Sequence, residues 1–406
     1  MREPVRSADA RQRTLERLRR LACEGLDVAA FLDRAGAALD RVVPSDVDTL
    51  PSPTWMTVDP ASRLLTSTYT VGCEMSTEEI VAFEYVSSDP GNRVSDVLGD
   101  PRGVRTSTEL LQREPSTARH YRALLASMGV EHEVLIALRG TDGVAWGAGY
   151  LVRAPGRAAF DDQDLAFLRT AAPLLADGVR RGLVHGEADG PEGPRAPAIV
   201  VLDERLEPEW RTPGADDWLA DLGGGGHGEL PTPVLSVAQA ALARDGSTPV
   251  AGPDPGDEAP VEGRVAAPSA DGLAVRVRAP RRGWVTLHGQ PLTGGPPRRV
   301  AVTIQAAATD RISTLLLATH GLTAREAEVA RHVLHGRSTA QIATALGVSP
   351  YTVQEHLKHI FEKTGVRSRR QLVAGLFARH YRSRVDDNEH RVSANRPIRG
   401  GPYPDT

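Results

Sequence analysis

Apolar residues follow two different periods along residues 1–184, and each period predicts a different kind of element. A helical period runs through residues 15–42 and again from about 161 to 183, where apolar side chains return every three or four positions. Strand-like runs lie between them at 55–58, 64–69, 133–139 and 144–153, separated by turn sequences such as Gly140-Thr141-Asp142-Gly143. Further helices are expected around 77–85 and 116–128, so this part should form a sheet with helices packed on it.

A second mixed segment covers residues 198–306. Strands are predicted at 198–202 and 207–211, helices at 215–222 and 234–243, and three closing strands at 273–279, 283–287 and 299–305. Within 273–279, Leu273, Val275 and Val277 alternate with Ala274, Arg276 and Arg278, which indicates a strand with one buried face. We therefore expect a second antiparallel sheet.

The connecting segments have different compositions. Residues 185–197 are polar and rich in glycine and proline, which predicts a linker, and residues 244–260 carry four prolines and are predicted to form a long loop. Residues 307–319 should form a connecting helix, and residues 386–406 lack any apolar period, so we expect them to be disordered. The predicted domains are therefore 1–184, 198–306 and 320–385.

Helix start and stop signals dominate residues 320–385. Thr323 with Glu326, Ser338 with Gln341 and Ser368 with Gln371 have the spacing of capping boxes, and Ser349-Pro350 is a further helix start. Glycines 336, 347 and 365 mark the helix ends. Four short helices are predicted, and only Gly347-Val348-Ser349 separates the second from the third.

That three-residue turn forces the second and third helices to cross steeply, as in a helix-turn-helix. On the third helix, Val353, Leu357, Ile360 and Thr364 fall on one stripe, and Tyr351, Glu355, Lys358 and Glu362 on the opposite one, with Gln354 at its flank. The helix should therefore pack one side and offer the other to a partner. A plain amphipathic surface helix is the alternative interpretation.

Charge favours a nucleic-acid partner. Residues 321–385 hold 11 of the 48 Lys+Arg and 4 of the 52 Asp+Glu, a net charge of +7, which leaves −11 for the rest of a chain with net charge −4. The two lysines of the chain, Lys358 and Lys363, both lie on the third helix of this module. A small basic module joined to an acidic body is typical of a nucleic-acid reader attached to a second function.

Residues 321–374 resemble the LuxR-type helix-turn-helix domain. The family's features are present as Leu322-Thr323, Arg325-Glu326, Gly336, Ile342-Ala343, Leu346, Ser349, Thr352-Val353, His356, Ile360, Lys363 and Ser368-Arg369. The sequence departs from the usual pattern at Thr364, where an apolar residue is usual, and at Ala330, where leucine is common. The resemblance implies that the third helix enters the major groove of double-stranded DNA.

Side-chain chemistry then divides the candidate contacts into two groups. Tyr351, Gln354, Glu355 and Lys358 are the candidates for base contacts, since they occupy the amino-terminal half of the third helix and can donate to or accept from base edges. Ser349, Thr352, His356, Lys363, Arg367 and Arg369 are the candidates for contacts to the DNA backbone, with a packing role as the alternative for His356.

The order of elements in residues 1–184 resembles a GAF-like sensor domain, and the order in residues 198–306 resembles a PAS-like domain. The overall class is therefore α+β, followed by an all-α module of four helices. A ligand cavity between the first sheet and its middle helices would be typical of the fold. Trp146, Tyr69 and Tyr85 are candidate lining residues, although core packing is the preferred interpretation of each.

The resemblances leave two hypotheses for the acidic body. In the favoured one, the GAF-like or PAS-like domain binds a small molecule of unknown identity and thereby controls the DNA-binding module. In the other, these domains serve only dimerisation or protein interaction. A homodimer is expected in either case, and RNA polymerase is a further candidate partner.

Several function classes are not supported by any motif. The chain has no G-x-S-x-G, H-E-x-x-H, C-x-x-C or Walker sequence, so we expect neither catalytic residues nor a metal site. Cys23 and Cys73 are interpreted as buried structural cysteines, with a redox pair as the alternative. No apolar run approaches the ~18 residues of a membrane helix and the amino end is charged, so a cytoplasmic protein without membrane contact is predicted.

Overall fold

The computed structural model describes residues 3–45, 53–69, 77–85, 93–113, 119–185, 196–223, 229–245, 273–293, 297–307, 320–334 and 336–373. The chain divides into two compact units. The first contains residues 1–186, 198–279 and 285–305, and the second contains residues 306–406 together with 187–197 and 280–284. Each unit is described by itself below.

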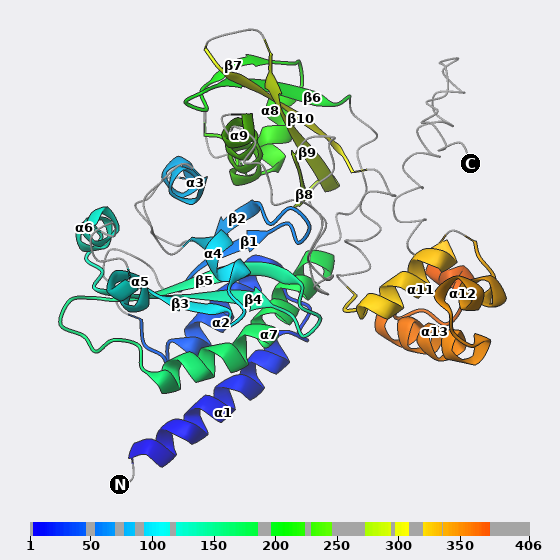
Figure 1. Ribbon diagram of the computed structural model, residues 1–406, viewed down its shortest axis with the longest axis horizontal. Coiled ribbons are helices and arrows are strands. Elements are labelled where there is room, and N and C mark those ends of the chain that lie inside the picture. Colours follow the sequence, from blue (N-terminus) through cyan, green and yellow to red (C-terminus); the bar gives the residue numbers. More distant parts are fainter. Residues whose placement is uncertain are drawn as a thin grey trace, which may run out of the picture. The chain divides into compact units, whose positions relative to one another are not determined.

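The first unit is built on two antiparallel sheets of five strands each (Figure 1). The first sheet consists of β1 (Thr54–Val58), β2 (Leu65–Tyr69), β3 (Val104–Thr106), β4 (His132–Arg139) and β5 (Ala145–Arg153), in the spatial order β2-β1-β5-β4-β3. The second consists of β6 (Ala198–Asp203), β7 (Pro208–Arg211), β8 (Leu273–Ala279), β9 (Gly283–Leu292) and β10 (Arg299–Ala306), in the order β7-β6-β10-β9-β8. Both sheets therefore have the same strand order relative to the chain.

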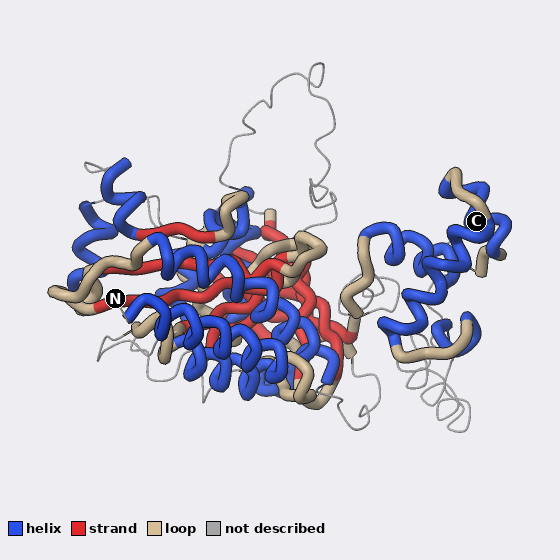
Figure 2. Tube along the Cα trace, turned by 90° about the horizontal axis from the view of Figure 1, so that it is seen from below, coloured by secondary structure: helices blue, strands red, loops and turns tan. Residues whose placement is uncertain are grey.

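Helices cover both faces of the first sheet. They are α1 (Glu3–Leu21), α2 (Val28–Leu39), α3 (Thr77–Tyr85), α4 (Val94–Gly99), α5 (Ser107–Arg113), α6 (Arg119–Ser127) and α7 (Asp162–His185). Gly36 of α2 lies against the indole of Trp55, whereas Met56 packs in one cluster with Val97 of α4. Neighbouring residues of a strand point to opposite faces, so α2 and α4 cover opposite sides of the sheet. Helices α1, α2 and α7 pack side by side, as seen from below in Figure 2.

The two sheets meet at their edges. Strand β2 ends the first sheet, β8 ends the second, and α9 (Thr232–Asp245) packs against both strands and against α3. Leu64 and Val81 from the first half of the unit belong to the same apolar core as α9, α8 (Ala215–Asp221) and the second sheet. The Tyr85 hydroxyl accepts a hydrogen bond from the edge amide of Leu65 at 2.9 Å.

An ion pair also joins the two halves of this unit. The Arg276 guanidinium on β8 lies 2.8 Å from the carboxylate of Asp59, which is 1% exposed at the β1–β2 turn. Arg278 donates from the same strand to the Leu183 carbonyl of α7 at 2.6 Å. The arginines that alternate with the buried valines of β8 thus face the first half of the unit. The predicted boundary between domains 1–184 and 198–306 stays a prediction, although both sheets lie in one compact unit.

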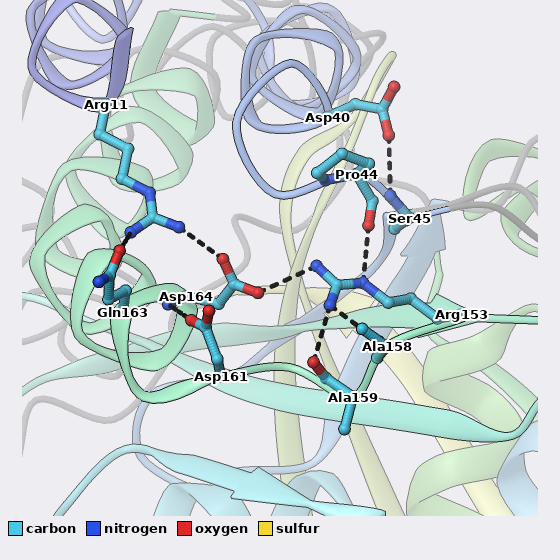
Figure 3. A network of polar contacts seen from close by, with 10 residues as sticks. All are labelled: Arg11, Asp40, Pro44, Ser45, Arg153, Ala158, Ala159, Asp161, Gln163 and Asp164. Atoms are coloured by element: carbon cyan, nitrogen blue, oxygen red, sulfur yellow. Dashed lines mark hydrogen bonds and ion pairs between the residues drawn. The ribbon is translucent and has the colours of Figure 1, made fainter. Parts of the chain in front are cut away.

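A polar network fixes α1 to the rest of the first half (Figure 3). The buried carboxylate of Asp164 accepts from Arg11 of α1 at 2.6 Å and from Arg153 of β5 at 3.0 Å. Arg153 also donates to the Pro44 carbonyl and stacks over the Phe160 ring, 4.0 Å from its centroid. Asp164 therefore ties three segments that are distant in sequence.

The second unit contains α11 (Ala324–Leu334), α12 (Thr339–Leu346) and α13 (Pro350–Thr364), and residues 369–373 begin a further helix. The elements predicted in 198–306 and 320–373 agree with these bounds to within a few residues. Helices α4 and α5 and strand β3 were not predicted, because each is short and lacks a clear period. The connecting helix at 307–319, the loop at 244–260 and the tail at 386–406 lie largely or wholly outside the described residues.

The interpretation of Cys23 as buried is wrong, because its side chain is exposed in the turn after α1, and Cys73 lies outside the described residues. Trp146 is fully buried, in agreement with core packing. Within the described part of the chain, no helix has both the length and the apolar character that a bilayer crossing requires.

Candidate nucleic-acid interface

Each helix of the second unit begins at a side-chain cap. Thr323 and Glu326 form a reciprocal capping box: the Thr323 amide donates to the Glu326 carboxylate, and the Glu326 amide donates to the Thr323 hydroxyl. Ser338 and Gln341 do the same for α12. The Ser349 hydroxyl accepts from the Thr352 amide at 3.1 Å, with Pro350 in the first turn of α13. Each cap contributes about 1 kcal/mol, which matters for helices this short.

The turn between α12 and α13 is closed by a left-handed residue. Gly347 has φ 64°, and the next two residues lead directly into α13. Arg325 of α11 donates to the Leu346 carbonyl at 2.8 Å and so satisfies a group at the end of α12. The short turn sets α12 and α13 in a helix-turn-helix arrangement, and the hydrogen bond from Arg325 holds the end of α12 against α11.

One apolar core holds the three helices together. Its buried members are Leu322, Val329, Ala330, Val333, Ile342, Ala343, Val353, Leu357, Ile360 and Leu372. Three of the four predicted inward residues of α13 are among them, and the fourth, Thr364, is half-buried and donates to the Ile360 carbonyl. Ala330, a departure from the LuxR pattern, is wholly buried without disturbing the core.

The opposite side of α13 is open to solvent. Tyr351 is 71% exposed, and Gln354, Glu355, Lys358 and Glu362 are exposed as well. All four candidates for base contacts therefore lie together on the outer side of one well-anchored helix. Their donors and acceptors are free to meet base edges from the outside, as the major groove requires.

A shallow groove of about 360 Å³ runs along the flank of α13. Its apolar lining consists of Leu357, Phe361 and Val366, and its polar lining consists of Gln354, Lys358, Glu362 and Arg367. Two of the base-contact candidates, Gln354 and Lys358, thus stand at the edge of an apolar surface. Arg367 stands beside the same groove from the segment that follows α13.

The candidates for backbone contacts are in different surroundings. Ser349 and Arg367 are exposed, while Thr352 and His356 are half-buried on the flank of α13. Lys363 donates to Glu326 at 2.6 Å, and the Arg369 guanidinium donates to the Arg337 carbonyl. Lys363 and Arg369 therefore also stabilise the module itself.

The buried carboxylate of Glu326 was not recognised from the sequence as more than a cap residue. Burial opposes its ionisation, but the hydrogen bonds from Lys363 and from the Thr323 amide outweigh burial and place the pKa of Glu326 below its ordinary value. Glu326 thus joins the start of α11 to the last turn of α13. The i, i+3 spacing to Thr323 indicated the first contact, but no local pattern indicates a lysine 37 positions away.

Comparison with known proteins agrees with this geometry. Residues 320–375 match the family model described as GerE, bacterial regulatory proteins, luxR family. An HTH-type transcriptional regulator of Mycobacterium bovis is 52% identical over 52 residues, which are 13% of this chain and 6% of that protein. The transcriptional regulatory protein SgaR of Hyphomicrobium methylovorum is 39% identical over 70 residues, 17% of this chain and 30% of that protein. The chain thus covers less than a third of either relative.

Among solved structures, PelD of Pseudomonas aeruginosa aligns over 77% of this chain and 82% of its own, at 13% identity and a TM-score of 0.28, too low to support a shared fold. The names of both relatives describe transcriptional regulators. Residues 320–375 are therefore a DNA-binding helix-turn-helix domain of the luxR family.

Proposed function

We propose that this chain is a sequence-specific transcriptional regulator that reads double-stranded DNA with α13. The observation that carries the proposal is the exposed row Tyr351, Gln354, Glu355 and Lys358 on a helix whose other side is locked into the module's core. Gln354 and Lys358 donate to base acceptors, and Glu355 accepts from a cytosine amino group. Ser349, Thr352, His356 and Arg367 contact phosphates from the flanks, and Lys363 and Arg369 do so from the end of the module.

Two single variants test this division of roles. DNA is first selected from a random pool with the full-length protein, and affinities are then measured by gel shift on the selected site and on a scrambled site. Lys358→Ala should lower affinity for the selected site about 10-fold and change little on the scrambled one, because a base contact contributes about 1–3 kcal/mol of discrimination. Arg367→Ala should weaken both to a similar extent, since a phosphate contact carries no sequence information.

Equal losses for Lys358→Ala on both DNAs would remove Lys358 from the base-reading group. Failure of the wild-type chain to select any sequence would remove the proposal as a whole.

The first unit is proposed to be a sensor with a GAF-like half and a PAS-like half. Support comes from the common strand order of its two sheets and from a buried polar cluster on the α4 side of the first sheet. Glu84 accepts from the Val94 and Ser95 amides, both at 2.8 Å, and burial nevertheless raises its pKa above the ordinary value. Glu133 accepts from the Tyr121 hydroxyl at 2.7 Å.

Tyr150 interacts electrostatically with both carboxylates. Burial raises the pKa of its hydroxyl well above the ordinary value, and the charges of Glu84 and Glu133 raise it further. A group of buried carboxylates and hydroxyls is costly to maintain in an apolar core. Such a cluster is the part of the unit best suited to recognise a polar small molecule, which would then bias the state of the DNA-binding module.

The alternative is a ligand-independent regulator whose first unit serves only dimerisation or protein interaction. Native mass spectrometry of the purified protein and thermal shift against a metabolite panel separate the two. A compound that stabilises the wild type but not Tyr150→Phe supports a sensor with its site in the cluster. Absence of any retained or stabilising compound favours the alternative. In both versions the regulator acts as a homodimer, and RNA polymerase is a candidate partner on the DNA.

A further inference from the structure

Large apolar side chains are exposed at few places in the described residues, and those places are not random. Four are exposed: Tyr351 on the DNA-reading helix, and Ile199, Trp210 and Leu292 on the second sheet. Trp210 is 58% exposed and Ile199 is 39% exposed. A concentration of exposed apolar residues outside the DNA-reading helix marks the second sheet as an interaction surface.

Strand register places most of these residues on one face. Val200 and Leu202 of β6 and Val302 and Ile304 of β10 are buried in the core shared with α8 and α9. The alternate residues must therefore point to the other face of the sheet. There, Val201 pairs with Trp210 on one side and with Ala301 on the other, and Ile199 pairs with Thr303. We refer to Ile199, Val201, Trp210, Ala301 and Thr303 as the outer patch.

One ion pair, which carries both signs of charge, borders the outer patch. The Arg299 guanidinium lies over the Trp210 ring, 5.3 Å from its centroid, and pairs with Glu209. The guanidinium of Arg299 thus holds Trp210 in place before any partner arrives, which lowers the entropic cost of binding.

This charge pattern selects the kind of partner. An arginine paired with an acid offers no net positive field, so the surface does not fit a nucleic acid or an anionic membrane. A patch that carries both signs around an apolar centre is complementary to a copy of itself rotated by a two-fold axis, since the arginine of one copy then faces the acid of the other. Trp210 and Arg299 lie together at the patch, and tryptophan and arginine are enriched at the hot spots of protein–protein interfaces.

We propose that the outer patch is the surface through which two copies of this chain form a homodimer, with Trp210 at its centre. The inference deepens the proposed function, because two luxR-type domains on one DNA require a dimer. The test of the interface measures the mass of the protein in solution, which does not depend on DNA binding. Failure of this inference and failure of the proposed function are therefore distinguishable.

The test compares the full-length wild type with two variants by sedimentation velocity over a range of concentrations. Trp210→Asp places a charge at the centre of the patch, and Tyr351→Asp makes the same kind of change at the other highly exposed aromatic residue. The wild type and Tyr351→Asp should sediment with twice the chain mass of 43.5 kDa. Trp210→Asp should raise the dimer dissociation constant at least about 30-fold, as expected for a hot-spot residue.

Both substituted residues are exposed, so the variants should keep the wild-type circular dichroism spectrum, and this is checked first. A second variant, Ile199→Asp, should weaken the dimer in the same direction. A wild type that stays monomeric at tens of micromolar, or a Trp210→Asp protein that keeps the dimer mass, would each overturn the proposal. Loss of the dimer in Tyr351→Asp would also overturn it by moving the interface to the DNA-binding module.

Discussion

Lys363 is a candidate for a contact to the DNA backbone and is also the ion-pair partner of Glu326. The ion pair determines how its removal changes the stability of the second unit. Glu326 is buried, and Lys363 is its cationic partner at 2.6 Å, with His359 further away at 3.9 Å. Lys363 itself is partly exposed, so solvent screens the pair and reduces what the pair contributes. Removing the lysine nevertheless leaves a buried carboxylate with fewer hydrogen bonds.

We predict that Lys363→Met destabilises the second unit by about 1 kcal/mol at neutral pH. Since the pKa of Glu326 is lowered in the folded chain, the stability it supplies is present above the ordinary value of 4.5 and is lost as the pH falls through the folded pKa. Hydrogen–deuterium exchange of the α13 amides, measured at pH 7 and at acidic pH, checks this. The difference between variant and wild type should shrink on acidification, and a constant difference would contradict the role of the carboxylate.

Side-chain positions in the second unit could be predicted from the sequence only in part. The inward and outward residues of α13 were predicted correctly because a helical period of 3.6 fixes which side chains share a face. The third predicted capping box is only half present. The Gln371 amide donates to the Ser368 hydroxyl as expected, but the Gln371 side chain accepts from the Arg367 amide instead of that of Ser368. The spacing of Ser368 and Gln371 therefore indicates where the helix starts. Which backbone amide the Gln371 side chain accepts from depends on the conformation of the residues just before the helix.

At the scale of elements, the turn between α12 and α13 orients the DNA-reading helix. Gly347 has a left-handed backbone, and a Cβ atom built there would meet no atom within 4 Å. A side chain at this position therefore has room, and the cost of a substitution comes from the backbone conformation alone.

We predict that Gly347→Ala destabilises the second unit by about 1–2 kcal/mol, the cost of a left-handed conformation for a residue with a Cβ atom. Gly347→Asn should cost less, because asparagine tolerates this conformation better than other residues. Hydrogen–deuterium exchange in α12 and α13 provides the measurement. Equal protection in the alanine variant and the wild type would show that the turn relaxes into another conformation.

The long elements were predicted from the sequence, and the elements that were missed are all short. The hairpin of β4 and β5 and the helix α7 were expected from runs of seven residues or more. Strand β3 has three residues and α4 has six, too few to establish a period against the surrounding sequence. The exposed patch on the second sheet could not be predicted either, since alternation shows which residues share a face but not which face a helix covers.

At the scale of the molecule, the first unit behaves as one body because its two sheets share a core and a buried ion pair. Asp59 is 1% exposed, and Arg276 supplies its cationic partner from a strand more than 200 residues later. The alternation along residues 273–279 puts Arg276 on the polar side of β8, but no local pattern joins Arg276 to Asp59. Cooperation between the two sheets is therefore a property that only the tertiary structure shows.

Removal of Arg276 measures how much the ion pair with Asp59 stabilises the first unit. Arg276→Met should lower the free energy of unfolding of the first unit by about 3 kcal/mol, because it leaves a buried carboxylate that keeps only the hydrogen bonds from Ser62. Adding Asp59→Asn removes the unpaired charge and should restore part of that loss. Urea unfolding followed by tryptophan fluorescence and circular dichroism gives both values.

Because the core is shared, the two probes should report one transition for the first unit in every variant. Two separated transitions in the wild type would show that the sheets unfold independently, and the ion pair would then be a contact between two separate domains.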